Sequence, residues 1–268
     1  MFMEESVLYK YLGGQRIEKF IKERQLRFTQ LQALNDPFES NVLLQMEVGD
    51  VVKAETLEDM KAKRKQRFPA KSAQIDTQFE RMQQASDYLS LPHVQGEMVT
   101  NYLSSLFGIL SLSRNHRNML MWSHYADSHT GFVVALDENH SFFSDSGREE
   151  FNPPLKRVTY RHNRKISELP TLDSLYCEKS LDWAYEEEER LFKDLEICEK
   201  QKSTCAFDCS IYLHEVPLDC IKEIYFGANM KEEQCFEYRK LISESMPNVS
   251  VYRASISPEE YSLNFTEL

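Results

Sequence analysis

Four consecutive glutamates, at positions 186–189, stand between aromatic and aliphatic side chains in the stretch DWAYEEEERLF, residues 182–192. In a helix, the four carboxylates would spread around most of a turn and be solvated. In a strand, they would divide between two faces, because strand side chains alternate with a period of two. The sequence leaves both interpretations open, although a charge run is more often a solvated face.

The strand interpretation combines carboxylates with a cation. One face then holds Glu186, Glu188, Arg190 and Phe192. The other face holds Trp183, Tyr185, Glu187, Glu189 and Leu191. Neighbouring carboxylates raise one another's pKa, whereas Arg190 would keep a carboxylate on its own face ionised. On the strand interpretation Glu188 is therefore a plausible ionised acceptor for a hydrogen bond from a hydroxyl, with Glu186 and Arg190 on the same face.

A second polar group lies in MLMWSHYADSHTGF, residues 119–132, which contains Trp122, His124, Tyr125 and His129. A neutral His between two aromatic side chains either acts as a general base or forms a hydrogen bond in the core, and the second role is commoner. His124 and His129 are five residues apart, so they do not share a helical face as the two His of H-E-x-x-H do. We expect no metal site here.

The other chemical motifs are weak. The six cysteines lie in the second half of the chain without a C-x-x-C pair, and the nearest to a zinc-like group is Cys205, Cys209 and His214. Reduced thiols in a cytoplasmic protein are the simpler interpretation, so we expect no metal. The sequence contains no G-x-G-x-x-G, G-x-x-x-x-G-K-[ST] or G-x-S-x-G motif, so familiar dinucleotide folds, P-loops and serine hydrolases are not indicated.

The charge and hydropathy of the chain exclude some classes. A formal net charge of -11 argues against a protein whose whole surface binds nucleic acid. The basic stretch KAKRKQRF at 61–68 is either a local nucleic-acid contact or a solvated face. No run of about 18 apolar residues occurs, and acidic residues stand near the start where a signal peptide needs basic ones. We expect a cytoplasmic protein that does not contact a membrane.

The first elements can be predicted from periodicity. VLYKYL at 7–12 is typical of a strand that ends at Gly13-Gly14, apolar spacing predicts a helix over 15–24, and a strand follows at 26–29. LNDPFES at 34–40 predicts a rigid polar loop, because Asn and Asp bond to their own backbone and Pro fixes φ.

The rest of the chain predicts a single α+β domain over residues 1–268 with a central mixed or antiparallel sheet. The expected helices do not stand regularly between successive strands, and this favours the α+β class over a doubly wound parallel sheet. A helical insertion is expected at about 51–106, with two charged helices over 51–90 and a third over 94–106. Strands are expected at 132–136, 155–162, 206–213, 221–226 and 249–253, and helices at 119–125, 171–181 and 231–245.

Several of these patches together resemble a known family. They are LYKYL at 8–12, NDPFE at 35–39, MLMWSHYADSHTGF at 119–132, WAYEEEERL at 183–191 and IKEIYFG at 221–227. The chain resembles, over nearly its whole length outside the helical insertion, the bacterial family called domain of unknown function 2971. That family name implies no activity.

A more distant resemblance is to the DarT-like ADP-ribosyltransferases. The strand LYKYL, the helix and the strand LRFT follow the order that opens those enzymes, and LSLSRNHRNMLMW is similar to a segment that supplies an Arg near NAD. The resemblance implies an ADP-ribosyltransferase-like fold and transfer of ADP-ribose from NAD to a nucleic acid or protein acceptor. A toxin or defence effector is a role that such an activity would fit.

The resemblance also implies site residues. Glu188 matches the catalytic Glu of a late strand, Lys10 stands at the polar position of the first strand, and Arg114 would lie near the pyrophosphate. The remaining candidates for NAD binding are Tyr11, Asn35, Asp36, Trp122, His124 and Tyr125, among which Trp122 or Tyr125 could stack on a ring. Transferases usually have His or Arg where this chain has Lys10, and a Lys contacts phosphate as a point charge but cannot replace a bidentate Arg.

Two alternatives stay open. One is a non-enzymatic binding module whose basic helices at 51–90 contact nucleic acid or a protein, and the other is a hydrolase or nuclease that uses the regions of His124 and Glu188. A cleft shared by Glu188, Lys10 and Arg114 would favour the transferase. The acceptor and the oligomeric state are not indicated by the sequence.

Overall fold

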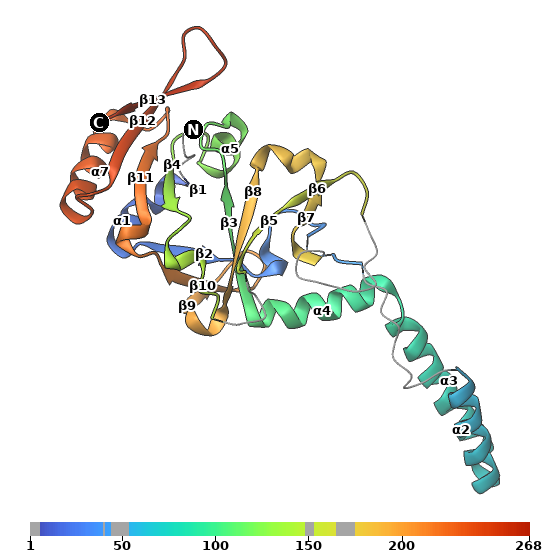
Figure 1. The fold of residues 1–268 in the computed structure, drawn as a ribbon. Helices are drawn as coiled ribbons and strands as arrows, with labels where there is room; N and C mark the ends of the chain where they lie inside the picture. Colours follow the sequence, from blue (N-terminus) through green and yellow to red (C-terminus); the bar gives the residue numbers. More distant parts are fainter. Residues whose placement is uncertain (1–5, 40, 44–53, 148–152, 165–174) are drawn as a thin grey trace.

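The computed structural model describes residues 6–39, 41–43, 54–147, 153–164 and 175–268 (Figure 1). Its main feature is an eight-stranded sheet. In spatial order the strands are β13 (Leu263–Glu267), β12 (Ser250–Ile256), β11 (Ile221–Phe226), β4 (Phe132–Asp137), β1 (Val7–Leu12), β3 (Phe107–Ser113), β8 (Glu188–Asp194) and β5 (Leu155–Arg157). Within this sheet β11 and β12 are parallel, and the other neighbouring pairs are antiparallel. The prediction of an α+β protein with a large mixed sheet is confirmed.

Two smaller sheets accompany the main one. The first contains β2 (Gln25–Phe28), β10 (Ser210–Glu215) and β9 (Glu199–Thr204), and it contacts β3 through a bridge between Thr29 and Ile109. The second contains β6 (Thr159–Arg161) and β7 (Glu178–Ser180), which are parallel. This small sheet brings β7 close to the start of β8, where the glutamate run lies.

The core lies on both faces of the sheet. Phe132 and Val134 of β4 belong to one cluster with residues of α1 (Ile17–Glu23) and α7 (Glu232–Ser245), and the intervening Val133 belongs to a second cluster with residues of α5 (Met119–Tyr125). β4 is thus buried from both sides, which explains its continuous run of apolar residues. Figure 1 shows α1 and α7 on one side and α5 on the other.

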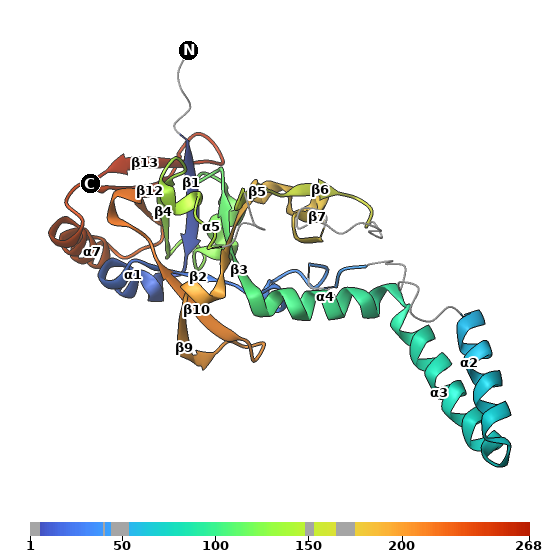
Figure 2. The same ribbon diagram turned by 60° about the horizontal axis from the view of Figure 1, so that its bottom comes forward.

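A helical hairpin projects from the sheet domain. It consists of α2 (Ala54–Arg67) and α3 (Ser72–Leu89), and α4 (Pro92–Leu106) connects it to β3 (Figures 1 and 2). The three helices that the sequence predicts in this region are confirmed, except that residues 51–53 lie outside the described residues. Among the hairpin side chains that the structure describes, Ile75 and Phe79 form a buried apolar cluster of their own. Among the described helices, none has the length and apolarity that a membrane crossing requires.

Three predictions of elements are wrong in part. Residues 178–180 form β7 rather than the end of a helix over 171–181, whose residues up to 174 lie outside the described ones. The expected strand 155–162 is two strands, because Val158 N–H bonds to β8 whereas Thr159 N–H bonds to Cys177 beside β7. The expected strand 206–213 is β10, preceded by a turn at 206–207.

Candidate functional site

The glutamate run is divided between a helix and a strand. A 3-10 helix spans Leu181–Glu186, with Ser180 at its N-cap, and Glu187 turns the chain through a left-handed conformation with φ of 44°. β8 begins at Glu188. The strand interpretation of residues 183–192 is therefore wrong for 183–187 and confirmed for 188–192. The turn at Glu187 breaks the alternation of faces, and this is why the faces expected for residues 183–187 do not apply.

The residues of β8 are all buried, yet five of its seven side chains carry ionisable groups. These are Glu188, Glu189, Arg190, Lys193 and Asp194. Glu189 accepts a bond from Arg114 Nε at 2.6 Å, and Arg114 also donates two bonds of 2.6 Å to Glu138. Glu188 instead bonds to Arg190, whose Nε and Nη2 lie 2.9 and 3.0 Å from its two carboxylate oxygens. The two glutamates are therefore bound to different arginines.

Five buried side chains form what we call the buried charge cluster: Glu39, Lys179, Glu186, Glu188 and Arg190. Lys179 Nζ donates to Glu186 Oε2 at 2.6 Å and to Glu188 Oε2 at 3.2 Å, and it lies 3.9 Å from Glu39 Oε2. Arg190 also donates to Glu39 and to the Tyr176 carbonyl. Three acidic side chains and two cations are thus paired in a largely buried cluster.

The cluster determines the ionisation of Glu188. Burial alone would favour the neutral acid, but the charges of Arg190 and Lys179 outweigh it and lower the pKa of Glu188 to about 2. Burial likewise opposes the charge of Lys179, yet Glu188, Glu39 and Glu186 raise its pKa above the ordinary value. Glu188 is therefore a carboxylate at neutral pH, with its charge held in a fixed position.

Glu188 lines a small cavity of about 80 Å³, which we call the Glu188 cavity. Its wall is built mainly from neighbouring strands of the main sheet, from α5 and from the NDPFE loop. The lining residues are Tyr9, Lys10, Tyr11, Asn35, Ser111, Leu112, Ser113, Met121, Tyr125, Lys179, Glu186 and Glu188. Of the residues singled out in the sequence, the cavity brings together Lys10, Tyr11, Asn35, Tyr125, Glu186 and Glu188.

The cavity lies where β1 and β3 separate. β1 pairs with β4 along all six of its residues, whereas β1 and β3 are in register only at Tyr9 and Ser113 in the described strands. The Ser111 carbonyl accepts a bond of 2.8 Å from Lys10 Nζ. Loss of water around the ammonium lowers the pKa of Lys10 to about 8, although the nearby Glu188 partly offsets this.

Tyr125 connects the NDPFE loop to the charge cluster. Its hydroxyl donates to Glu186 Oε1 at 2.5 Å and accepts from Asn35 Nδ2 at 2.8 Å. Burial and the hydrogen bond to Glu186 raise the pKa of Tyr125 above the ordinary value, so the phenol keeps its proton. Tyr11 donates to the Asn115 carbonyl at 2.7 Å and also keeps its proton, because burial raises its pKa. The wall of the cavity is therefore fixed by hydrogen bonds.

Residues 121–191 match the model of the family described as "Protein of unknown function (DUF2971)". The match runs from α5 to β8 and includes Tyr125 and Glu188, and it supports the resemblance to that family. No curated protein and no solved structure matches the chain. The comparisons therefore name no activity for the Glu188 cavity.

Five residues that the sequence places at the site do not line the Glu188 cavity, namely Asp36, Arg114, Trp122, His124 and Arg190. Arg114 is engaged by Glu138 and Glu189, so the expected cleft shared by Lys10, Glu188 and Arg114 does not form in this way. Trp122 is fully buried, and its Nε1 donates to the His116 carbonyl at 2.7 Å. His124 is exposed on α5. A joint catalytic site of His124 and Glu188 therefore has no geometric support.

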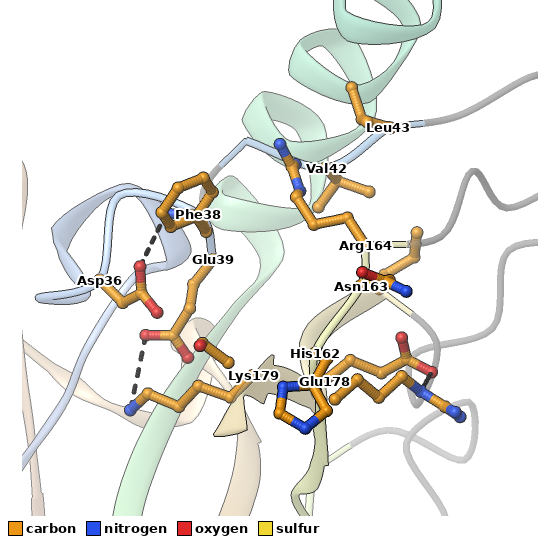
Figure 3. A pocket seen from close by; sticks show the side chains of 13 residues that line it. Asp36, Phe38, Glu39, Val42, Leu43, His162, Asn163, Arg164, Glu178 and Lys179 are labelled. Atoms are coloured by element: carbon orange, nitrogen blue, oxygen red, sulfur yellow. Dashed lines mark hydrogen bonds and ion pairs between the residues drawn. The ribbon is translucent and has the colours of Figure 1, made fainter. Parts of the chain in front are cut away.

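Asp36 lines a second and larger cavity of about 330 Å³, which we call the Asp36 cavity. Glu39 and Lys179 of the buried charge cluster form part of its wall, and Lys179 lines both cavities. The lining residues are Asp36, Phe38, Glu39, Val42, Leu43, Arg161, His162, Asn163, Arg164, Leu175, Glu178, Lys179 and Ser180 (Figure 3).

Sequence reasoning missed three residues that contribute to the site. Glu39 stands at the end of the NDPFE motif, which was interpreted as a turn. Lys179 was assigned to a helix, although it lies on β7. The Tyr160 hydroxyl oxygen accepts a hydrogen bond of 2.8 Å from the Glu188 N–H, and Tyr160 is not recognisable from the sequence because its strand is expected to be part of one continuous element. No local pattern marks any of the three.

The described part of the chain contains no group of three or more His, Cys, Asp or Glu side chains arranged to hold a metal ion. The six cysteines are free thiols. Cys205 and Cys209 lie at the turn between β9 and β10, and the Cys205 N–H donates to the Cys209 carbonyl at 2.9 Å. His214 stands on β10 and its Nδ1 lies 2.9 Å from the Glu215 carbonyl.

Proposed function

We propose that the protein transfers ADP-ribose from NAD to a nucleic acid or protein acceptor, with Glu188 as the catalytic carboxylate. The observation that carries the proposal is the position of Glu188: a buried, ionised carboxylate beside a cavity that also contains Lys10 and Tyr125. Such a carboxylate can stabilise developing positive charge strongly, because little water screens it.

The chemistry needs a carboxylate of this kind. When the bond between the ribose C1 and the nicotinamide nitrogen breaks, the bonding electrons stay with nicotinamide, which leaves as a neutral molecule. The ribose then has oxocarbenium-like character, which a carboxylate bonded to a ribose hydroxyl stabilises, as in glycoside hydrolysis. Glu188 would accept that bond, and the acceptor nucleophile would then bond to C1.

Lys10 and Tyr125 have supporting roles in the proposal. Lys10 lies in the wall as a cation that can contact a phosphate, in place of the His or Arg usual in transferases. The Tyr125 hydroxyl holds Glu186 and Asn35 in position and so shapes the cavity. The cavity is smaller than the 300–1,000 Å³ or so that is typical of ligand sites, so only the reacting end of NAD would enter it.

A second candidate is a non-enzymatic module that binds nucleic acid. It is favoured by the exposed basic side chains of α2, namely Lys63, Arg64 and Arg67. Lys61 and Lys65 of the same helix are engaged by Asp76 instead, at 3.3 and 2.5 Å. In the transferase proposal the same three residues would help to hold a nucleic-acid acceptor.

The test is incubation with NAD labelled in the adenylate moiety, together with cell extract or nucleic acid, for the wild type and Glu188→Gln. We expect label transfer to fall roughly 100-fold or more in the variant, as when one transition-state contact is lost. Glu189→Gln is the matched control. It removes a neighbouring buried carboxylate of the same strand that faces Arg114 rather than the cavity, so it should transfer label at close to the wild-type rate.

Circular dichroism and thermal unfolding of both variants show whether each is folded at the assay temperature. Equal transfer by folded Glu188→Gln and wild type would refute the residue assignment. Absence of both label transfer and NAD binding, with nucleic acids and proteins as acceptors, would refute the class of reaction and favour the binding module.

A further inference from the structure

The Asp36 cavity has the size of a small-molecule site. Its volume of about 330 Å³ falls within the 300–1,000 Å³ or so usual for ligand pockets. In Figure 3 the carboxylates of Asp36 and Glu39 lie on one side of the cavity, and His162, Asn163 and Arg164 lie on the other. The cavity thus has an acidic side and a side with cationic and polar groups.

The acidic side contains a carboxylate oxygen without a partner. Asp36 is 2% exposed, and its Oδ1 accepts the Phe38 N–H at 2.9 Å. Its Oδ2 is buried and accepts no hydrogen bond from the residues that the structure describes. A buried acceptor left unpaired is costly, and buried polar atoms of folded proteins almost always have a partner. Asp36 Oδ2 therefore lacks a hydrogen-bond donor that a ligand can supply.

Glu39 presents a second such oxygen. Its Oε1 accepts from Arg190, whereas its Oε2 is buried without a hydrogen bond, 3.9 Å from Lys179 Nζ. Burial raises the pKa of Glu39 despite the charges of Arg190 and Lys179. Two buried oxygens of the NDPFE loop, Asp36 Oδ2 and Glu39 Oε2, thus have no hydrogen bond from the described residues.

The cavity wall also contains an aromatic ring, that of Phe38, on which a ligand ring could stack. Phe38 is 60% exposed, so much of its ring is open to contact with a ligand. The Arg164 guanidinium lies 5.4 Å from the centre of its ring. An aromatic ring next to a guanidinium plane is a combination on which nucleobases stack. The exposed side chains of His162 and Arg164 can contact a phosphate.

We infer that the Asp36 cavity binds a nucleotide whose base carries an exocyclic amino group. The amino group donates to Asp36 Oδ2, as amino groups of bases donate to Asp and Glu elsewhere. The base stacks on Phe38, and the phosphate lies toward His162 and Arg164. Two molecules contain this chemistry, the adenylate half of NAD and a nucleotide acceptor. Which of the two molecules binds depends on the proposed transferase function. The inference that a nucleotide binds in the Asp36 cavity does not depend on that function.

The test compares ligands that differ at the amino group. Calorimetric titration of the wild-type protein with AMP, IMP, CMP and UMP should show AMP bound more tightly than IMP and CMP more tightly than UMP, because IMP and UMP present a carbonyl oxygen where the amino group stands. Equal affinity within both pairs would overturn the inference.

Asp36→Asn gives a sharper comparison. The Phe38 N–H needs an acceptor, so the amide oxygen takes the place of Oδ1 and the amide NH₂ takes the place of Oδ2. The variant then donates where the wild type accepts, and we expect UMP to bind more tightly than CMP. An unchanged preference for CMP in the folded variant would overturn the assignment of Asp36.

Phe38→Ala is the second variant and, because the side chain is largely exposed, it should leave the fold intact. We expect a loss of nucleotide affinity of roughly 5- to 150-fold, as for the loss of one stacking aromatic. Full affinity in Phe38→Ala would overturn the stacking.

Competition with NAD distinguishes the two sources of nucleotide. Displacement of bound AMP by NAD, lost in Asp36→Asn, would assign the cavity to the adenylate half of NAD. Simultaneous binding of NAD and CMP would assign it to the acceptor. Selective, Asp36-dependent binding of CMP or AMP without any label transfer would support the nucleotide site while refuting the transferase proposal, so the two failures can be told apart.

Discussion

Arg190→Met tests whether the buried charge cluster behaves as a unit. Arg190 is 1% exposed, and its guanidinium donates to both oxygens of Glu188, to Glu39 and to the Tyr176 carbonyl. Methionine is unbranched and fills a similar space without the charge. The variant therefore leaves the three buried carboxylates of the cluster with Lys179 as its one remaining cation.

The magnitude follows from burial. Removing one partner of a buried ion pair costs about 3–5 kcal/mol, because the other charge stays uncompensated. The cost should depend on pH. The folded-state pKa of Glu188, about 2, is below its ordinary value of 4.5, so the ionised form stabilises the fold above pH 4.5. That contribution, about 3 kcal/mol at 1.36 kcal/mol per pKa unit, is lost as the pH falls from 4.5 toward 2.

In Arg190→Met the main charge that lowers the pKa of Glu188 is absent, so its carboxyl binds a proton at a higher pH in the folded protein. The difference in the free energy of unfolding between wild type and variant should therefore be about 3–5 kcal/mol at pH 7 and smaller at pH 4. Urea unfolding followed by circular dichroism measures it at each pH.

Arg114→Met is the control for this prediction. Arg114 also contacts two carboxylates, Glu138 and Glu189, but 29% of its side chain is exposed to water. Its replacement should cost less than that of Arg190, because water reaches the side chains of Arg114 and Glu138, which are 29% and 22% exposed. The reasoning fails if Arg190→Met costs no more than Arg114→Met at pH 7, or if its cost is the same at pH 4.

Three further predictions concern other residues. Tyr125→Phe removes the hydroxyl that donates to the buried Glu186 and should lower the free energy of unfolding by about 1.5–3 kcal/mol in urea; a neutral result would mean that this bond has little effect. Lys10 has a pKa of about 8 when folded and an ordinary value of 10.5, so its contribution to stability rises with pH between these values, and thermal unfolding of Lys10→Met should lack that rise. An equal rise in both proteins would contradict the assignment. Phe79→Ala should speed amide hydrogen exchange in α2 and α3 and leave the main sheet protected, because the hairpin has its own small core; loss of protection in the sheet would contradict this.

Much of the fold can be predicted from local patterns. The strand, helix and strand at the start of the chain, the buried β4, the helix α7 between β11 and β12, and the three helices over 54–106 all follow from periodicity and turn residues. These elements have strong signals because each buries one defined face, or, for β4, both. Among the site residues, Glu188 could be singled out from strand alternation, whereas Lys10 and Asn35 are singled out only through the resemblance to known transferases.

The predictions of secondary structure are wrong where a segment changes the strand with which it pairs. Val158 bonds to β8 and Thr159 bonds beside β7, so an alternating segment becomes two strands in two sheets. Lys179 was expected on a helix, but it lies on a strand that pairs with β6. Pairing between segments distant in the sequence decides such places, and local propensity does not contain that information.

The sequence by itself determined the residue types of the site and the kind of element on which most of them stand. It also indicated that Glu188 and Arg190 share a face, since a strand period of two requires it once β8 begins. Only the tertiary structure decided that Arg114 neutralises Glu189 rather than facing the Glu188 cavity, and that Lys179 and Glu39 complete the charge around Glu188. The physical reason is that a buried charge is stabilised by whichever opposite charge the fold brings within a few ångströms, and residues 39, 179 and 188 meet only after three separate segments have packed together.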